Sequence, residues 1–404
     1  MQNKIMSTVK SFSKRLLDFI IRLFKTDEAR SFYATIFAII LGLIFGFIVM
    51  LIASPSDIFY GYNAVLTGGS TRLGDVLYYA APILMTGLSV GFAFKMGLFN
   101  IGASGQYTMG MLFAIYVGLV WKMPDSIHWI ACILAGIIGG MFWGLIPGIL
   151  KALLNVNEVI TSIMTNYIGV YLVDMVIQQN RILYNSTTVR TRYLPESAQL
   201  KSFGIANSNV NISIIIGILI AIILFIVLYK TTFGYELIAT GRNKHASQYA
   251  GINYKRNTIM TLVIAGGLSG LGGALMILAP SNIPGASMTY EPINRIAANG
   301  FNGIAVALLG NSNPIGIIFS AIFISYIQRG GTLASIYGYK PEIIDIVVAI
   351  IIYFSAFALV MNTVVKKIFT KIGGLMKSSI KNKRKGVNKD SSQPKEIKKD
   401  IKEA

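Results

Sequence analysis

Residues 91–106 read Gly91-Phe92-Ala93-Phe94-Lys95-Met96-Gly97-Leu98-Phe99-Asn100-Ile101-Gly102-Ala103-Ser104-Gly105-Gln106. This segment carries a lysine, two amide side chains and several glycines, yet apolar sequence of membrane length flanks it on both sides. Hydrocarbon holds no water that could satisfy polar groups. Irregular backbone and amides therefore persist at membrane depth only where protein or a cavity surrounds them. A broken, glycine-rich segment of this kind is typical of a transport path, and a short loop between two helices is the alternative.

The composition places the chain among integral membrane proteins. Of its 404 residues, 54% are hydrophobic and 13% are charged. Soluble domains carry about a quarter charged residues, so this chain lies well outside their range. The charged residues collect at the two ends and in a few short loops, which leaves long apolar stretches between them. We therefore expect an all-α polytopic membrane protein.

The net charge of +19 fits the same interpretation. Basic residues concentrate in Met1–Arg30 and Lys366–Lys402, and both segments adjoin apolar spans. Lysine and arginine near span ends mark the cytoplasmic face, so we expect two cytoplasmic termini rather than a nucleic-acid-binding protein. The expected organisation is a cytoplasmic segment over 1–30, a transmembrane domain over 31–365 and a basic, disordered cytoplasmic tail over 366–404.

A membrane span needs about twenty apolar residues, and fewer where it is broken. On that scale we expect about ten transmembrane helices, an even number that agrees with two cytoplasmic termini. The predicted spans are Phe32–Ala53, Pro82–Phe94, Ile101–Val120, Ile127–Leu150, Val159–Ile177, Ile212–Leu228, Thr258–Ala279, Ile293–Leu309, Pro314–Ile327 and Ile343–Val364. The polar segments 54–75 and 178–211 then lie outside, and the basic loop 230–256 lies inside. Pro292, between Glu291 and Arg295, is predicted to begin a helix whose charges pair with each other.

Small residues recur along single helix faces. Glycines stand at every fourth position from Gly136 to Gly148, and Gly266, Gly270 and Ala274 repeat the pattern. Small residues at this spacing let two helix backbones approach closely within a membrane, so we expect these faces to pack against other helices. The sequence Phe99–Ala103 is also echoed by Phe301–Ala305, which weakly supports a fold built from two related halves.

Residue patterns that carry enzyme chemistry are missing from the sequence. It contains no Gly-x-x-x-x-Gly-Lys-Ser/Thr phosphate loop, no Gly-x-Ser-x-Gly elbow and no His-Glu-x-x-His pair. Any ATPase that drives transport would therefore be another chain. The acidic residues inside the spans, Glu158, Asp174, Glu342 and Asp345, stand near span ends, which favours capping or interface positions over a proton relay. The two histidines are too far apart in sequence to indicate a metal site.

The basic loop contains a short segment, 241–252, with a glycine at each end and a predicted helix between. Ala246 and Ala250 would give that helix a small-residue face, because residues four apart are neighbours on a helix. Such a face can seat in a groove on another protein, and an ordinary loop helix is the alternative.

Several of these segments resemble one family of transporters. The segment 100–106 resembles the Phe-Asn-Ile-Gly-x-x-Gly-Gln signature of the ribose and branched-chain amino-acid permease superfamily of ABC importers. Asn157–Ile160 with Asn166–Ile168, and Gly303–Gly310 with Asn313–Gly316, are similar to elements of its nucleoside-importing branch. The alanine pair before Gly251-Ile252 resembles the coupling helix of such permeases. The resemblance runs from about residue 80 to residue 357.

This resemblance implies a permease subunit with the vitamin-B12-importer (type II) ABC permease fold, in a bacterial plasma membrane. It would form the translocation path for nucleosides by alternating access. Its implied partners are an ABC ATPase subunit, a second related permease, an extracellular substrate-binding lipoprotein and membrane lipids. No cofactor is expected on this chain, because the partner subunit would hydrolyse the ATP. A simple sugar or branched-chain amino acid as cargo, or a stand-alone ion-coupled carrier, is the alternative.

Candidate site residues follow from the same motifs. Amides can exchange hydrogen bonds with base edges and ribose hydroxyls, and aromatic rings can stack on a base. Their alternative role is to satisfy the backbone of a broken helix. The predicted substrate path comprises Phe99, Asn100, Gln106, Asn166, Phe301 and Asn302. The predicted ATPase contact comprises Gly241, Asn243, His245, Ala246, Ser247, Ala250 and Gly251. Ser104 departs from the glutamate that relatives commonly carry there, so any role of that carboxylate is absent here.

Overall fold

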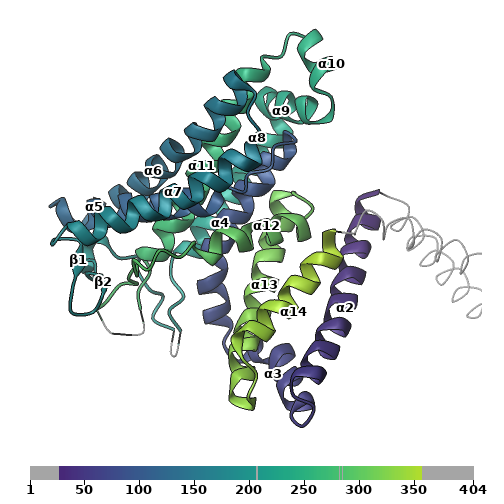
Figure 1. The fold of residues 1–404 in the computed structure, drawn as a ribbon, viewed down its shortest axis with the longest axis vertical. Coiled ribbons are helices and arrows are strands. Elements are labelled where there is room, and N and C mark those ends of the chain that lie inside the picture. The colour runs from purple at the N-terminus through teal and green to yellow at the C-terminus, as the bar shows by residue number, and fades with distance from the viewer. Residues whose placement is uncertain (1–26, 206–207, 282, 284, 357–404) are drawn as a thin grey trace, which may run out of the picture. The chain divides into compact units, whose positions relative to one another are not determined.

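Figure 1 shows the computed structural model, which describes residues 27–205, 208–281, 283 and 285–356. Almost all of the predicted N-terminal segment 1–30, and the whole predicted tail 366–404, lie outside the described residues. The chain divides into two units, and the first contributes only residues 27–38 to the described part. The second unit, Ile39–Ala356, contains the core and every contact discussed below.

Helices account for nearly all regular structure in the described chain. They are α2 (Asp27–Ala53), α3 (Ile58–Thr71), α4 (Leu73–Lys95), α5 (Ala103–Val120), α6 (Asp125–Leu154), α7 (Glu158–Gln179), α8 (Ser213–Lys230), α9 (Thr232–Arg242), α10 (Lys244–Tyr249), α11 (Tyr254–Ile277), α12 (Ala298–Leu309), α13 (Pro314–Ala334) and α14 (Pro341–Ala356). Two short strands, β1 (Tyr184–Asn185) and β2 (Arg190–Thr191), form an antiparallel hairpin. The short 3-10 helices are η1 (Glu196–Ala198) and η2 (Ser335–Tyr337).

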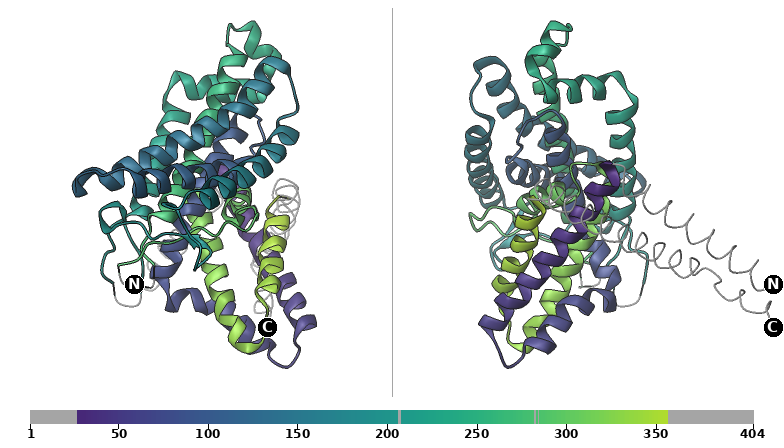
Figure 2. Two further views of the ribbon diagram at one scale, coloured as in Figure 1. Left: turned by 60° about the vertical axis from the view of Figure 1, so that its left-hand side comes forward. Right: turned by 90° about the vertical axis from the view of Figure 1, so that its right-hand side faces the viewer.

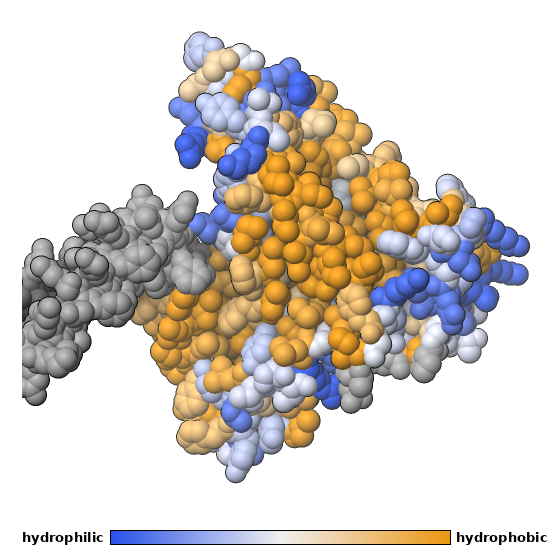
Figure 3. All heavy atoms as spheres, turned by 180° about the vertical axis from the view of Figure 1, so that it is seen from behind, coloured by the Kyte–Doolittle hydropathy of each residue, from blue (hydrophilic) through white to orange (hydrophobic). Residues whose placement is uncertain are grey.

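The all-α membrane architecture is confirmed. Among the described residues, seven helices are long and apolar enough to span a membrane: α4, α5, α6, α7, α8, α11 and α13. The stretch Ile39–Ala53 of α2 and the whole of α12 are shorter apolar helices. The total of about ten crossings stays a prediction. Figure 3 shows a broad hydrophobic surface with hydrophilic side chains at its margins, including the end that carries α9 and α10.

Helix α4 is the buried centre of the unit. It packs against α8, α11, α12 and α13, and most of its side chains between Ala80 and Ala93 are buried. The helix begins at Leu73, well before the predicted span start at Pro82, which lies inside it. The polar segment before it contains α3, a helix that packs on α13. The predicted span Pro82–Phe94 is therefore too short, since the helix extends to Leu73 and packs against four other helices.

The glycine stripes form a close helix–helix contact. Helices α5, α6 and α11 pack side by side, as Figures 1 and 2 show. A Cβ atom added to Gly140 would lie 2.2 Å from the carbonyl oxygen of Gly266, and one added to Gly270 would lie 2.3 Å from that of Gly136. Only glycine allows the two backbones to approach this closely, and the predicted packing role of the stripes is confirmed.

An extended segment precedes α12. Residues 287–297, here called the strap, run between the β1–β2 hairpin and the start of α12 at Ala298. The backbone N–H of Thr191 in β2 donates to the Tyr290 carbonyl oxygen at 3.0 Å, and the Tyr290 N–H donates to the Thr191 side-chain hydroxyl at 2.9 Å. The predicted helix start at Pro292 is therefore wrong. Glu291 forms an ion pair with Arg190 of the hairpin, in place of the predicted pairing with Arg295 within a helix.

Candidate functional site

The break in the opening motif lies between α4 and α5. Helix α4 ends when Gly97 adopts a left-handed backbone conformation, with a φ angle of 75°. The backbone N–H groups of Gly97 and Leu98 then donate to the carbonyl oxygens of Phe94 and Ala93, at 2.9 and 3.1 Å. These bonds satisfy the last carbonyls of the helix, and glycine adopts this conformation without steric cost. The chain can therefore turn within a buried environment.

Two amides of the motif pair with each other. The Nδ2 atom of Asn100 donates to Oε1 of Gln106 at 2.9 Å, and Nε2 of Gln106 donates back to Oδ1 of Asn100 at 3.2 Å. Asn100 also donates to the hydroxyl of Ser89 on α4 at 3.1 Å. Asn100 is 0% and Gln106 is 1% exposed, so the pair is sealed from solvent. These hydrogen bonds connect the break to α4 through Ser89 and to α5 through Gln106.

A third amide reaches the break from α7. Asn166 accepts a hydrogen bond from the backbone N–H of Gly105 at 2.8 Å and donates to the carbonyl oxygen of Ile101 at 2.9 Å. Gly105 leaves room for this contact, since a Cβ there would lie 2.9 Å from the Cα of Asn166. Asn166 is buried as well. Asn100, Gln106 and Asn166 thus satisfy backbone and side-chain groups of the broken region.

The start of α12 rests on α4 and α5. The hydroxyl of Thr86 donates to the carbonyl oxygen of Asn299 at 2.8 Å, and that of Ser104 donates to the carbonyl oxygen of Ala297 at 3.1 Å. The Asn299 side chain donates to the Tyr107 hydroxyl at 3.1 Å. Thr86, Tyr107 and Asn299 were not predicted from the sequence. Only their polarity within apolar runs could have indicated them.

The structure gives a physical reason for serine at position 104. A Cβ atom added to Gly300 would lie 2.1 Å from the Ser104 hydroxyl oxygen, so α12 approaches α5 as closely as these small residues allow. Ser104 is 0% exposed. A glutamate would bring a longer, charged side chain into this contact, and burying an unpaired charge is costly.

The remaining predicted path residues keep accessible surface. Phe301 is 41% exposed, and the neighbouring Asn302 on α12 is half-buried. Phe99 is half-buried and stacks on Phe94, with ring centroids 5.1 Å apart and an interplanar angle of 17°. Of the six predicted path residues, only Phe99, Phe301 and Asn302 therefore keep exposed surface, and their contact with a solute stays a prediction. Asn100, Gln106 and Asn166 point inward.

The predicted coupling segment forms a projecting turn. The side chain of Asn243 caps α10 by accepting a hydrogen bond from the Ala246 backbone N–H at 3.0 Å. Gly251 ends the turn with a φ angle of 84°. Most predicted contact residues are exposed, whereas Ser247 is 4% exposed and its hydroxyl donates to the Lys244 carbonyl oxygen at 2.8 Å. The exposed residues are Gly241, Asn243, His245, Ala246, Ala250 and Gly251.

This turn abuts the end of α4. A Cβ atom added to Gly241 would lie 2.4 Å from the carbonyl oxygen of Lys95, directly before the break. Lys244 reinforces the turn by placing its ammonium 3.9 Å from the centroid of the Tyr254 ring on α11. The coupling segment and the opening motif, remote in sequence, are therefore in direct contact.

Near the C-terminal end of α7, the buried carboxylate of Asp174 forms hydrogen bonds with the strap. Asp174 accepts hydrogen bonds of 2.6 Å from the Tyr290 hydroxyl and 2.6 Å from the backbone N–H of Asn294. Asp174 is 2% exposed. Burial, assisted by the hydrogen bond and the negative charge of Asp174, raises the pKa of the Tyr290 phenol, which therefore stays protonated and donates. The Gln178 side-chain amide also donates a hydrogen bond of 3.0 Å to the Pro292 carbonyl oxygen of the strap.

The reciprocal amide pair makes a testable prediction about stability. Asn100→Ala and Gln106→Ala each leave a buried amide without its partner, which costs about 1–3 kcal/mol. The double variant should lose less than the sum, with a coupling energy of about 0.5–3 kcal/mol. Thermal unfolding of the purified protein in detergent measures this, with Asn302→Ala as the control for loss of a half-buried amide. Strictly additive losses would contradict the pairing.

Known proteins place the chain within a family. Residues 72–356 match the family described as branched-chain amino acid transport system / permease component. The chain is 35% identical to the nucleoside ABC transporter permease protein NupB of Lactococcus lactis subsp. cremoris, over 89% of this chain and 99% of that protein. It is also 35% identical to the guanosine ABC transporter permease protein NupP of Bacillus subtilis, over 83% and 95% respectively.

A second permease of the same Lactococcus strain, the nucleoside ABC transporter permease protein NupC, is 26% identical over 65% of this chain and 84% of its own length. No solved structure matches the chain. The family match covers the break, the strap, the coupling turn and α12 together. The chain therefore belongs to the family of permease components of branched-chain amino acid transport systems, and it is a permease subunit rather than the ATPase of its transporter.

Proposed function

We propose that this chain forms the translocation path for nucleosides in an ATP-driven ABC importer of a bacterial plasma membrane. The observation that carries the proposal is its 35% identity, over 89% of the chain, to a nucleoside ABC transporter permease. The opening motif supports it, because its amides build a broken-helix region of the kind found beside transport paths. A separate ATPase hydrolyses the ATP, and no cofactor resides on this chain.

The partners follow from the same assignment. A second, related permease completes the path, and the match to two permeases of one Lactococcus strain supports a heterodimer. An extracellular lipoprotein delivers the nucleoside, and the ATPase binds the exposed turn around α10. The basic ends of the chain support cytoplasmic termini, which puts α10 in the cytoplasm and the β1–β2 hairpin outside.

The contacts within the unit suggest how ATPase movement reaches the path. Gly241 in the coupling turn lies in close contact with the end of α4 at Lys95. Helix α4 in turn holds the start of α12 through Thr86. A shift of the turn would therefore displace α12, which carries Phe301 and Asn302. Aromatic stacking by Phe99 or Phe301 and an amide contact from Asn302 suit a base and its ribose.

Transport by the reconstituted complex tests this proposal. The permease pair, the ATPase and the binding protein in proteoliposomes should import labelled guanosine or adenosine when ATP is supplied. Excess unlabelled nucleoside should compete, whereas ribose and leucine should not. Nucleoside uptake that survives deletion of this chain in cells would contradict the proposal. Transport by this chain alone with a proton gradient would instead identify a secondary carrier.

A further inference from the structure

Helix α13 carries an arginine within apolar sequence. Arg329 is the single charged residue between Pro314 and Ala334, and this helix is among those long and apolar enough to span a membrane. A charged side chain is costly in such a helix. Where one occurs, it usually pairs with an opposite charge or marks the route of a polar solute. The surroundings of Arg329 decide between these two roles.

Among the described residues, Arg329 has no acidic partner. The acidic residue in the adjoining part of α4 is Asp75, which pairs instead with Arg72 at 3.7 Å. The guanidinium of Arg329 lies over the Tyr79 ring of α4, with its central carbon 3.8 Å from the ring centroid. Its Nε atom is buried without a hydrogen-bond partner, and the residue as a whole is half-buried. Arg329 thus keeps unused donors at a partly accessible position.

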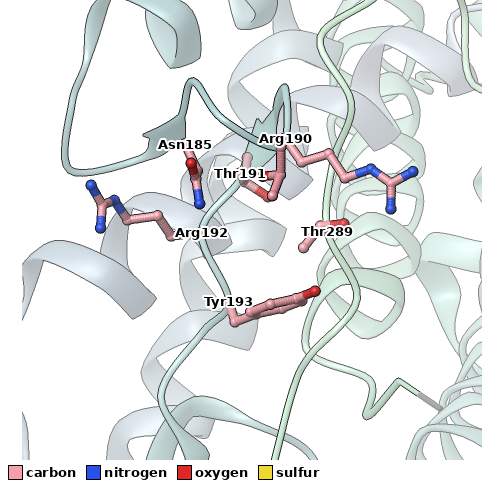
Figure 4. Close-up of a pocket in the computed structure, with 7 residues that line it drawn as sticks. Asn185, Arg190, Thr191, Arg192, Tyr193 and Thr289 are labelled. Atoms are coloured by element: carbon pink, nitrogen blue, oxygen red, sulfur yellow. The ribbon is translucent and has the colours of Figure 1, made fainter. Parts of the chain in front are cut away.

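The arginines of the outer hairpin are placed differently. Figure 4 shows Arg190 and Arg192 reaching outward in opposite directions beside a pocket, and Arg190 pairs with Glu291. Both arginines are exposed, as is usual for charged side chains at a protein surface. Arg329 differs in burial and in its lack of an acidic partner, so an ordinary surface role does not account for it.

Tyr79 provides a fixed platform for the cation. Its ring meets that of Tyr78 edge to face, with centroids 4.8 Å apart and an interplanar angle of 79°. The Tyr78 hydroxyl in turn donates to the carbonyl oxygen of Pro280 at 3.0 Å. Attraction between a guanidinium and the face of an aromatic ring uses none of the in-plane N–H donors. The Arg329 donors therefore stay available to a ligand while the cation is held in place.

The Arg329 side chain points inward along α13. The Ser325 hydroxyl donates to the Val76 carbonyl oxygen at 2.7 Å, which aligns the antiparallel helices α13 and α4. Arg329 follows Ser325 by one turn toward the outer end of α13, whereas Tyr79 follows Val76 by almost one turn toward the inner end of α4. The side chain therefore reaches back inward, as helix side chains lean. An arginine that extended to outer lipid headgroups would point the opposite way.

The pair of Arg329 and Tyr79 lies on the outer side of the start of α12. Thr86, which holds that start, is seven residues after Tyr79, and residues seven apart share one face of a helix. Helix α12 packs against both α4 and α13, as Figure 1 shows. In the proposed orientation α4 begins outside, so an entering solute would meet Arg329 before the predicted path residue Phe301 of α12.

A purine base offers the acceptors that such an arginine binds. The rigid fork of guanidinium N–H groups matches two neighbouring acceptors, the O6 and N7 atoms of a 6-oxopurine such as guanine or hypoxanthine. Adenine carries an amino group in place of O6, so the same fork would face another donor. The edge of the base that is read in this way therefore separates two classes of purine nucleoside.

We propose that Arg329, held on Tyr79, binds the O6 and N7 acceptors of a 6-oxopurine nucleoside entering the path, and so favours guanosine and inosine over adenosine. This inference rests on the proposed function, because it requires a nucleoside as cargo. It assigns Arg329 as a specificity-determining residue and Tyr79 as the residue that positions it.

Uptake of three nucleosides by the reconstituted complex tests this assignment. Initial rates are measured with the binding protein fully loaded by guanosine, inosine or adenosine, so that its own preference does not enter. Arg329→Gln should lower guanosine and inosine uptake about ten-fold or more, and adenosine uptake less than about two-fold. Arg329→Lys keeps the charge but not the fork, so its preference should lie between those of Arg329→Gln and the wild type.

Further variants separate recognition from folding and from charge. Tyr79→Leu removes the platform, so it should weaken the preference for guanosine more than Tyr79→Phe, which keeps an aromatic face. Lys122→Gln, at an exposed lysine between α5 and α6, is the control for the loss of one positive charge. Thermal unfolding of each purified variant shows whether the fold is retained.

Each contrary outcome overturns the inference. Equal losses for all three nucleosides would make Arg329 a structural residue only, and unchanged rates would exclude it from the path. Inosine uptake that follows adenosine would place recognition at the 2-amino group, and an equal change in Lys122→Gln would indicate bulk charge. Inhibition of wild-type uptake by guanosine 5′-phosphate that Arg329→Gln relieves would assign Arg329 to a phosphate instead.

These results leave the proposed function intact, provided that the wild-type complex imports a labelled nucleoside. Absence of nucleoside uptake by the wild-type complex would instead contradict the proposed function.

Discussion

Replacing Gly270 with alanine is expected to weaken the packing of α6 against α11 strongly. The new Cβ would lie 2.3 Å from the Gly136 carbonyl oxygen and 2.8 Å from the Cα of Gly140, and both are backbone atoms that no side-chain rotation can move. The helices would have to separate, and overpacking of this kind costs about 1–3 kcal/mol or more. Gly110 of α5 also lies against Gly270, so the loss of packing should extend to a third helix.

A matched alanine substitution controls this expectation. A Cβ added to Gly148, in the same stripe of α6, would lie 3.4 Å from its nearest neighbour, the Cα of Ile259, which is an ordinary contact. Gly148→Ala should therefore express and unfold like the wild type. Gly270→Ala should give a strongly reduced monodisperse yield and a thermal midpoint several degrees lower, as expected for a loss of this size. Equal behaviour of the two variants would contradict the close contact.

The features that could be predicted best from the sequence are those set by neighbouring residues or by a short repeat. The glycine stripes follow the helical period, so their packing role could be inferred without knowing the partner helix. Asn100 and Gln106 could be identified because they stand together in one motif, although their reciprocal bonds could not. Helix α10 was foreseen from glycines on either side of a short segment.

The errors arose where distant segments decide local structure. The predicted span began at Pro82, yet α4 begins at Leu73 and is stabilised by packing against α8, α11, α12 and α13. Glu291 was expected to pair with the nearby Arg295 but pairs with Arg190 on the hairpin, and α12 begins only at Ala298. The attachment of α12 to Thr86 and Ser104 joins segments separated by about half the chain. No periodic pattern carries information of that kind.

Replacing Ala246 with arginine is expected to abolish nucleoside uptake and ATPase capture without unfolding the chain. Ala246 is exposed, and α10 packs mainly on α9 and α11, so the change touches few internal contacts. A long charged side chain would nevertheless block the small-residue face that we propose to seat in a groove of the ATPase. Loss of a central interface contact of this kind costs about 2 kcal/mol or more, which is over ten-fold in affinity.

The same substitution two residues on provides the control. Gln248 is also exposed, but it lies on a different face of α10 because residues two apart do not face the same way on a helix. Gln248→Arg should therefore retain most ATPase capture and uptake, with the same thermal midpoint as Ala246→Arg. Co-purification of the ATPase with the tagged permease separates coupling from folding. If Ala246→Arg retained the ATPase and imported guanosine normally, the ATPase would have to bind elsewhere. The contact of Gly241 with the end of α4 would then have no role in driving α12.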